Sequence, residues 1–256
     1  MTVLGKSPAW ADAGGACSGY LVESGAISVL LDCGPGVLGK LRAVRDYATV
    51  DALVISHLHA DHMLDVIPFA SALIYGPRWA REPAARPRPV LHAPPGARDA
   101  FMVVCEGSGM FGTHVEDAFE LREYDPAETL AIGPLAVRFR PVPHYVPTNA
   151  VELAEGGRRL TFSSDCGPNV ELCDFARDTD LLLIEASMTE DGAAEDGERG
   201  HLTPREAGEH GRRAGARRVV LTHVSDELDA DAAIAEAAEA YGAPVELATE
   251  RASYDV

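Results

Sequence analysis

The most informative stretch of this sequence is Ser56-His57-Leu58-His59-Ala60-Asp61-His62, which directly follows the apolar run Ala52-Leu53-Val54-Ile55. Three imidazoles and one carboxylate within six residues are the ligand types that bind zinc and similar divalent metals in proteins. The short, continuously apolar run predicts a strand that is buried on both faces. A strand therefore ends where the candidate ligands begin.

The spacing of these ligands suits two adjacent metals. Side chains alternate along extended chain, so His57 and His59 point the same way and can hold one ion together. Asp61 and His62 stand at the start of residues 63–75, whose apolar positions predict a helix, and the turn directs this pair to a neighbouring point. The competing interpretation makes Asp61 a helix N-cap and the histidines polar loop residues, but four ligand-type residues in this spacing favour metal binding.

His-x-His-x-Asp-His after a buried strand resembles the signature of the metallo-β-lactamase superfamily of metallohydrolases. That family expects a further histidine, then an aspartate, then a last histidine, each at the end of a strand, and His144, Asp165 and His223 match this order. The resemblance covers nearly the whole chain. It implies one metal held by His57, His59 and His144 and a second held by Asp61, His62 and His223, with Asp165 bridging the two.

The resemblance also implies the kind of metal and its chemistry. In related redox enzymes a glutamate replaces the second histidine of the signature and the metals are iron, whereas His59 keeps the imidazole here. This favours zinc, with manganese as the usual substitute, so we predict two divalent metal ions as cofactors. Two such ions about 3.5–4 Å apart lower the pKa of a shared water to about 7 and supply hydroxide at neutral pH. We predict Asp61 and His201 as the catalytic residues.

The remaining chain alternates strands with helices. The strands that should deliver ligands are residues 135–142 before His144, the second strand of a 150–154 and 159–163 hairpin before Asp165, and 219–222 before His223. Two strand-rich halves with helices outside match the αββα sandwich that the resemblance implies. The predicted fold class is therefore α/β, in one metallo-β-lactamase-like domain over residues 1–256.

Two further motifs belong to the predicted site. Asp32-Cys33-Gly34 resembles the first motif of the family, which implies that Asp32 orients the ligands from behind the metals. A helix start with a capping box is predicted at Thr203, Pro204 and Glu206. We predict Glu206 near the site as well, although the capping box alone would explain a glutamate at this position. His201 resembles the His-Ser/Leu-Thr motif of the ribonuclease Z and phosphodiesterase branch, where this histidine faces the scissile phosphate. Its position suits a general acid or oxyanion stabiliser.

The size of the substrate is limited by two observations. Twenty residues separate His144 from Asp165, enough for one hairpin, whereas ribonuclease Z inserts a long substrate-gripping arm there. The net charge of −18 repels polyanions, and the proline-rich, arginine-containing run 77–89 is interpreted as a solvated connector. A large nucleic acid is therefore an unfavoured partner. The motifs look most like those of short actinobacterial members related to cyclic-nucleotide phosphodiesterases, which indicates a small phosphodiester such as a cyclic nucleotide.

Alternatives stay open for the substrate. A lactonase or thioesterase would use the same two metals, and ribonuclease Z-type RNA processing or a non-catalytic scaffold are further alternatives. The loop Lys6-Ser7-Pro8-Ala9-Trp10 replaces the Gly-Cys-Ser-Gly-Ser type loop of many relatives, so the mouth of the pocket is unusual.

The composition of the sequence indicates the cellular compartment of the protein. The sequence has no apolar run of the about 20 residues that a membrane span needs, and no signal-peptide pattern at its start. Five cysteines without a paired spacing favour reduced thiols, so we expect a cytoplasmic protein with no membrane association. The small, acidic and glycine-rich segment between Ser187 and Gly200 is expected to be a mobile loop. A homodimer is left open.

Overall fold

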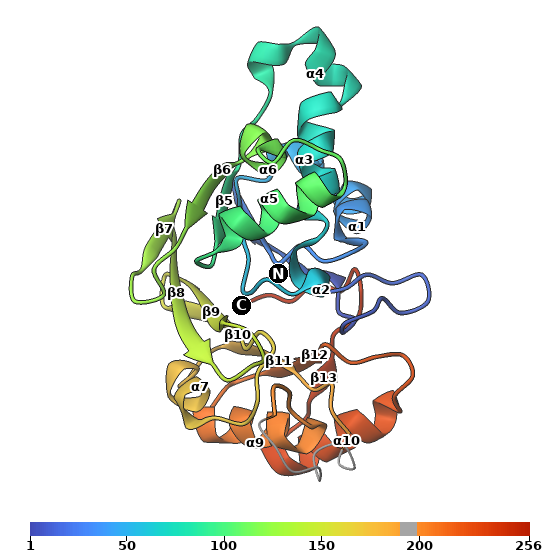
Figure 1. Ribbon diagram of the computed structural model, residues 1–256. Helices are drawn as coiled ribbons and strands as arrows, with labels where there is room; N and C mark the ends of the chain where they lie inside the picture. The colour runs from blue at the N-terminus through green and yellow to red at the C-terminus, as the bar shows by residue number, and fades with distance from the viewer. Residues whose placement is uncertain (190–198) are drawn as a thin grey trace.

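The computed structural model describes residues 1–189 and 199–256. In this part of the chain two β-sheets stack face to face, and helices cover both outer faces (Figure 1). The strands of the first sheet are, in spatial order, β1 (Thr2–Gly5), β2 (Gly19–Ser24), β3 (Ile27–Leu31), β4 (Ala52–Val54), β5 (Val90–Ala93) and β6 (Glu120–Glu123). Those of the second are β13 (Glu246–Leu247), β12 (Val219–Thr222), β11 (Leu181–Glu185), β10 (Arg158–Phe162), β9 (Thr148–Glu155), β8 (Leu135–Val142) and β7 (Leu130–Ile132).

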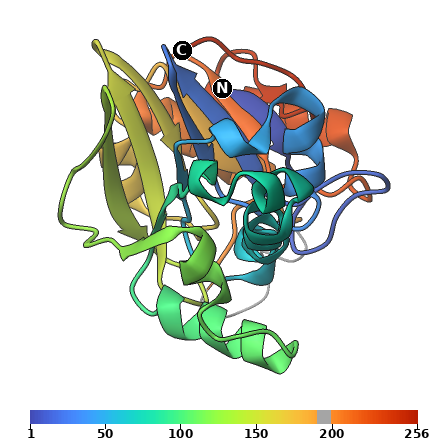
Figure 2. The same cartoon turned by 90° about the horizontal axis from the view of Figure 1, so that it is seen from above.

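The helices divide between the two sheets. On the side of the first sheet lie α1 (Val37–Val44), η1 (Tyr47–Thr49), α2 (Ala60–Met63), α3 (Val66–Tyr75), α4 (Pro77–Arg81), η2 (Pro83–Ala85), α5 (Ala97–Gly107) and α6 (His114–Ala118). On the side of the second lie α7 (Val170–Phe175), α9 (Pro204–Ala214) and α10 (Ala230–Tyr241). Seen from above in Figure 2, α1, α3 and α5 are spread over the strands beneath them, while α4 extends away from the body in Figure 1. The predicted α/β class and αββα sandwich are confirmed.

Three hydrophobic cores fill the spaces between the four layers. In β3, Leu30 packs toward the helices of its own sheet and Leu31 packs toward the other sheet. In β11, Leu182 packs toward the outer helices and Leu183 toward the first sheet. Side chains of a strand alternate between its two faces, so strands covered on both faces must be apolar at every position. This is why the central strands read as continuous apolar runs.

The helix predicted over residues 63–75 is wrong at its start. The structure has a separate short helix, α2, ending at Met63, and α3 begins at Val66. At the junction, the backbone N–H of Asp65 donates to the carbonyl of Cys33 (3.0 Å), and the Asp65 carboxylate accepts from the N–H of Leu38 (2.9 Å). These two bonds tie the junction to the turn after β3 and to the first turn of α1. Asp61 and His62 therefore lie on a helical turn with its own direction.

Other sequence predictions agree with the structure. β9 and β10 form the expected antiparallel hairpin, with Glu155 opposite Arg158 across the Gly156-Gly157 turn. Helix α9 begins with the expected capping box, in which the Thr203 hydroxyl accepts from the Glu206 N–H and the Glu206 carboxylate accepts from the Thr203 N–H. Residues 190–198, the centre of the expected acidic loop, lie outside the described residues. Over residues 1–189 and 199–256, no helix is both long and apolar enough to cross a membrane.

Candidate metal centre

Strand direction brings the candidate ligands to one edge of the sandwich. β10, β11 and β12 are parallel, and β8 runs in the same direction as β10 because each is antiparallel to β9. In the other sheet β3 and β4 are parallel. The carboxyl ends of parallel strands meet at one edge, where open α/β sheets place their sites. The turns after β8, β10 and β12 carry His144, Asp165 and His223, and the turn after β4 carries His57 to His62.

Two of these turns, and the turn after β3, contain a residue in left-handed backbone conformation. Asp32 (φ 56°) directly follows β3, His223 (φ 57°) directly follows β12, and Ser164 (φ 54°) immediately precedes Asp165. Residues with a side chain rarely adopt positive φ values, and such strain concentrates at functional sites. The chain bends sharply at each point, which turns the side chains inward at the ends of the strands.

The seven predicted ligands form two groups of four that share Asp165. One group is His57, His59, His144 and Asp165, and the other is Asp61, His62, Asp165 and His223; within each group one ligand atom per residue lies within 4.8 Å of all the others. The shortest separation in the first group is 3.0 Å, between His144 Nε2 and His59 Nδ1. In the second, His62 Nε2 lies 3.2 Å from Asp165 Oδ1 and His223 Nε2 lies 3.2 Å from Asp61 Oδ2.

These separations fit the ligand spacing of a small divalent ion. Zinc–ligand bonds of about 2.0–2.1 Å in a tetrahedron place neighbouring ligand atoms roughly 3.3 Å apart. Three of the atoms involved, His57 Nε2, His62 Nε2 and Asp165 Oδ1, are buried and make no hydrogen bond. Buried polar atoms normally have a partner, so converging atoms without one indicate a ligand position. The residues therefore suit metal ions, and their individual roles as ligands stay a prediction.

Hydrogen bonds from behind fix the orientation of the imidazoles. His62 donates from Nδ1 to Asp32 Oδ2 at 2.7 Å, and Asp32 also accepts from the N–H and the hydroxyl of Ser56 at 2.7 and 2.8 Å. His144 donates from Nδ1 to the carbonyl of Gly200 at 2.7 Å. Partners of this kind hold the ring and leave its other nitrogen free for a metal. Asp32 thus lies behind the candidate ligands, and its role in orienting them stays a prediction.

Gly34 shows how tightly the Asp32 turn packs under the site. A Cβ atom built on Gly34 would lie 1.8 Å from the carbonyl oxygen of Asp61. No side chain fits there, which explains the glycine of the Asp-x-Gly motif. The backbone of the turn after β3 therefore directly supports the helical turn that carries two candidate ligands.

The electrostatics of the cluster favour bound cations. Burial lowers the pKa of His57, His59 and His144, so these rings stay neutral and keep a lone pair available. Burial raises the pKa of Asp165, but the charges of His223 and His62 outweigh it and hold the pKa well below its usual range. Asp165 is therefore a carboxylate at neutral pH, and it needs positive charge beside it.

His201 lies at the margin of the cluster. Its ring is 4.9 Å from that of His144 and 5.7 Å from that of His223, and its Nδ1 donates to Glu185 Oε1 at 2.8 Å. Burial lowers the pKa of His201, but the hydrogen bond and charge of Glu185, together with Asp165, raise it above its ordinary value overall. Glu185, His201 and His223 also form a third group with metal-ligand spacing.

Glu185 has no assigned role in the sequence analysis. It is fully buried and ends β11, a strand whose other residues are apolar. An acidic residue at the end of a buried apolar strand is the signal that would have identified it, because a buried charge needs a partner. Glu206 is also predicted near the site, and this role stays a prediction. Among the described residues its carboxylate bonds Arg199 and the Thr203 N–H, and no bond joins it to a candidate ligand.

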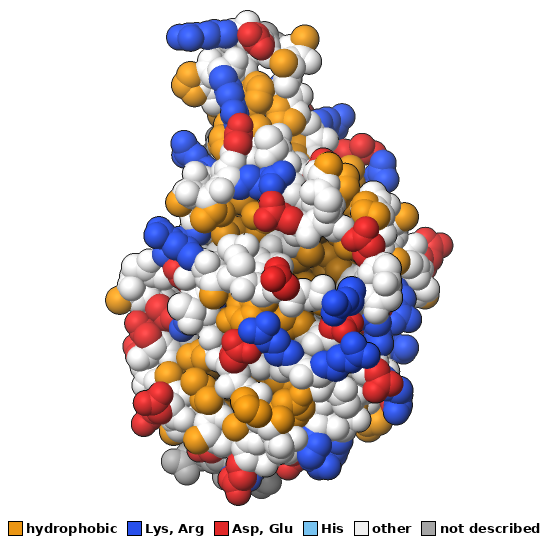
Figure 3. Space-filling model, turned by 180° about the vertical axis from the view of Figure 1, so that it is seen from behind, with side chains coloured by type: hydrophobic (Ala, Val, Ile, Leu, Met, Phe, Trp, Pro, Cys, Tyr) orange, Lys and Arg blue, Asp and Glu red, His pale blue; other side chains and the backbone are white. Residues whose placement is uncertain are grey.

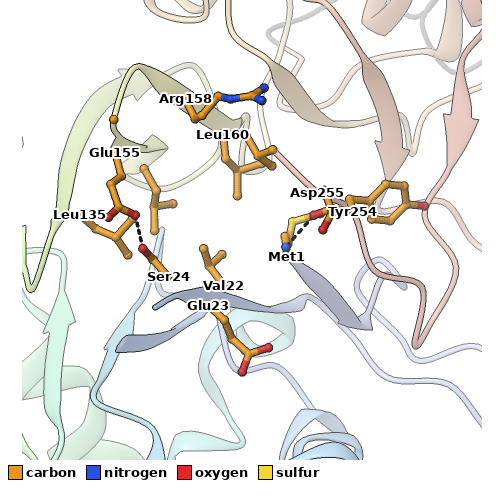
Figure 4. Close-up of a pocket in the computed structure, with 13 residues that line it drawn as sticks. Met1, Val22, Glu23, Ser24, Leu135, Glu155, Arg158, Leu160, Tyr254 and Asp255 are labelled. Carbon is orange, nitrogen blue, oxygen red and sulfur yellow. Dashed lines mark hydrogen bonds between the residues drawn. The ribbon is translucent and has the colours of Figure 1, made fainter. Parts of the chain in front are cut away.

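A cavity of about 370 Å³ opens onto the cluster. Its polar lining includes His59, Asp61, Asp165, His201 and His223, and its apolar lining comes from the loop before β2 and from Leu228. A second cavity, of about 410 Å³, lies near the two chain ends, and none of the thirteen residues that line it is a histidine or cysteine (Figure 4). Only the first of the two combines space for a ligand with the metal-type groups.

Comparison with known proteins places this fold and site. A family model described as "Beta-lactamase superfamily domain" matches residues 28–224, and the chain belongs to this superfamily, the metallo-β-lactamase superfamily. The chain is similar to the probable metallo-hydrolase YhfI of Bacillus subtilis, with 30% identity over 88% of this chain and 86% of the relative. The crystal structure of YhfI superposes with a TM-score of 0.84 at 27% identity, over 98% of this chain and 96% of the other. A ribonuclease Z of Myxococcus xanthus is 30% identical over 97% of this chain and 94% of its own.

Proposed function

We propose that this metallohydrolase is a phosphodiesterase that uses two divalent metals, zinc or manganese, to cleave a small phosphodiester such as a cyclic nucleotide. The observation that carries the proposal is His201, which lines the cavity of the metal-type groups and is held from behind by the buried Glu185, with 2.8 Å between Oε1 and Nδ1. It adds a proton-carrying group to a site whose other histidines all belong to the two ligand groups. The similarity to a ribonuclease Z supports phosphodiester chemistry.

Each part of the site has a separate task in this proposal. His57, His59 and His144 would hold one ion, Asp61, His62 and His223 the other, and Asp165 both. Bound ions of this kind activate water for attack and neutralise charge that develops on the substrate. Asp32 and the Gly200 carbonyl keep the imidazoles aimed at the ions.

His201 would act on the leaving oxygen. Glu185 holds its Nδ1, so Nε2 is the nitrogen that can reach a substrate in the cavity. From there the ring can donate a hydrogen bond to the departing oxygen or to the phosphoryl oxygens as negative charge develops on them. Asp61 serves the reaction as a predicted metal ligand.

The surface supports a small substrate rather than a large nucleic acid. The face seen in Figure 3 mixes basic and acidic side chains and presents no continuous basic stripe. In the arginine-containing run before β5, Arg78 pairs with Asp46 (2.7 Å), and Arg86 and Arg88 donate to backbone carbonyls. The charge of Arg78 is thus balanced by a carboxylate, and the carbonyl bonds hold the side chains of Arg86 and Arg88 against the protein. A cytoplasmic location is proposed with this, because all five cysteines are free and buried.

Hydrolysis of a substrate panel tests the proposal. Zinc- and manganese-loaded protein is assayed with 3′,5′- and 2′,3′-cyclic nucleotides, an aryl phosphodiester, a lactone and a thioester. We expect phosphodiester turnover that falls by about 100-fold or more in His201→Ala, while bound metal stays at the wild-type level. His114→Ala is the control, because this histidine stacks on Tyr75 under the outer helices (ring centroids 5.9 Å). Turnover of the lactone or thioester alone would refute phosphodiester cleavage in favour of acyl hydrolysis.

A further inference from the structure

The loop between β1 and β2 places an exposed tryptophan at the mouth of the metal cavity. Pro8, Ala9 and Trp10 line the cavity from one side together with Leu228 from the segment before α10. The Trp10 residue is 54% exposed, the highest fraction among the large hydrophobic residues that line this cavity. Among the described residues no ring stacking or cation contact involves its indole. An indole on the wall of a cavity can stack on a ligand, which would remove more of its apolar surface from water.

The structure holds this loop in a defined position. Lys6 forms an ion pair with Asp12, and its Nζ also donates to the carbonyl of Val224 at 2.7 Å. The N–H of Asp226 donates to Asp12 Oδ1 at 3.0 Å, and the N–H of Ala13 donates to Asp226 Oδ2 at 3.1 Å. The loop (dark blue in Figure 1) is thus attached on both sides of Trp10 to the segment that follows His223. A side chain carried on a braced loop is pre-organised for binding.

We infer that Trp10 selects for substrates that carry an aromatic base, by forming a platform on which the base of the phosphodiester stacks. This rests on the proposed function. The cavity has the metal-type cluster on one side and Trp10 and Leu228 on the other, with Ser225 and Glu227 as polar lining beside Leu228. This lining matches a ligand with an anionic end that faces the metal-type cluster and a flat body that can pack on the indole. Its volume of about 370 Å³ lies at the small end of ligand sites, which run from about 300 to 1,000 Å³, and this suits a mononucleotide.

Stacking on a tryptophan tolerates any base, because every base has a π-face. Truncation of such a platform typically costs roughly 10- to 100-fold in affinity. The loss should appear in KM rather than kcat, since the base is remote from the reacting phosphorus and binds equally before and during the reaction. For a cyclic phosphate of ribose that carries no base, truncation of Trp10 should leave KM unchanged.

Fluorescence measures the stacking without turnover. The chain has two tryptophans, and Trp79→Phe leaves Trp10 as the only one; Trp79 lies on α4 beneath the Arg78 guanidinium (4.4 Å), away from the cavity. Zinc-loaded protein with this substitution is titrated with adenosine 5′-monophosphate and, as the matched control, with ribose 5-phosphate. We expect saturable quenching by the nucleotide and none by the sugar phosphate. Equal responses to both, or no quenching by the nucleotide, would overturn the inference.

Kinetics separate this inference from the proposed function. Trp10→Ala should raise KM for a 3′,5′-cyclic nucleotide by roughly 10- to 100-fold and leave the base-free cyclic phosphate within about twofold, and Trp10→Phe should restore most of the loss. Equal losses on both substrates would overturn the platform while leaving the phosphodiesterase intact. Saturable quenching by the nucleotide, with no hydrolysis of any phosphodiester, would instead refute the proposed function and retain the platform.

Discussion

Asp32→Asn should weaken metal binding without changing the volume of the buried site. Asp32 is fully buried and accepts three hydrogen bonds, two from Ser56 and one from His62 Nδ1 at 2.7 Å. Asparagine keeps one acceptor oxygen, which can serve the Ser56 N–H. Its amide nitrogen would then replace Oδ2 and donate hydrogen bonds instead of accepting them. The Ser56 hydroxyl can rotate and accept such a bond. His62 Nδ1 can accept one only if it carries no proton. Asparagine also tolerates the left-handed backbone at this position (φ 56°).

The expected magnitude follows from the His62 tautomer. Facing an amide donor, His62 Nδ1 must give up its proton, and the proton moves to Nε2, the atom that lies 3.3 Å from Asp61 and 3.2 Å from Asp165. A protonated Nε2 cannot bind a metal. Metal binding therefore requires the proton to return to His62 Nδ1, which breaks the hydrogen bond from the amide and leaves two N–H groups facing each other. A hydrogen bond to a charged partner contributes about 1.5–3 kcal/mol. This corresponds to roughly 10- to 150-fold weaker binding of the metal that His62 is predicted to hold.

Competition with a chromophoric zinc chelator measures this affinity, and denaturant unfolding of the metal-free protein measures stability. Asp51→Asn is the matched control, because the Asp51 carboxylate also accepts an N–H (2.8 Å) and a hydroxyl (3.1 Å) of one serine, Ser28, but no imidazole. Both variants should lose about 1–3 kcal/mol of unfolding free energy, and only Asp32→Asn should lose zinc affinity. Wild-type zinc affinity in Asp32→Asn would refute the tautomer reasoning.

Three further predictions concern the surroundings of the site. Glu185→Gln should lower activity roughly 10- to 100-fold and shift the pH–rate profile, because His201 loses its carboxylate partner; initial rates across pH, with metal content as control, measure this. Gly200→Ala should reduce metal content by elemental analysis, because its Cβ would lie 2.8 Å from Nδ1 of His144, a predicted ligand that the Gly200 carbonyl holds, whereas Gly107→Ala, with open space around it, should not. Burial raises the pKa of the Cys17 thiol to about 12, so this thiol should resist a disulfide reagent at pH 8 in folded protein. In the unfolded chain the same thiol ionises near its ordinary pKa of 9.0, so its contribution to stability is present below pH 9 and is lost as the pH rises toward 12; unfolding curves across this range would show the decline.

Local signals explain why much of this molecule can be predicted from sequence. The apolar run before Ser56 specifies a strand buried on both faces, and the helix start at Thr203 follows from side-chain hydrogen bonds that span only three residues. The Gly156-Gly157 turn specifies the hairpin β9–β10 in the same way. In each case the interacting groups are close in the sequence, so spacing and residue type suffice.

The break before α3 and the partners of the catalytic candidates depend on contacts between distant segments. Asp65 ends one helical turn because it bonds Cys33, from the turn after β3, and Leu38, from the first turn of α1. Glu185 meets His201 only because β11 ends at the same edge as the turn before α9. Neither contact has a periodicity or a fixed spacing that a sequence pattern could reveal.

The sequence by itself determined the superfamily, the sandwich and the set of residues suited to metal, because these follow from a dense ligand motif and from strands that are apolar on both faces. The tertiary structure alone decided which nitrogen of each imidazole faces the cluster, which carboxylate holds His201 and which loop carries Trp10 to the cavity mouth. The physical reason is that these features arise where the ends of strands from two different sheets meet. The order and direction of those strands are set by packing of the whole chain, and no local stretch of sequence encodes them.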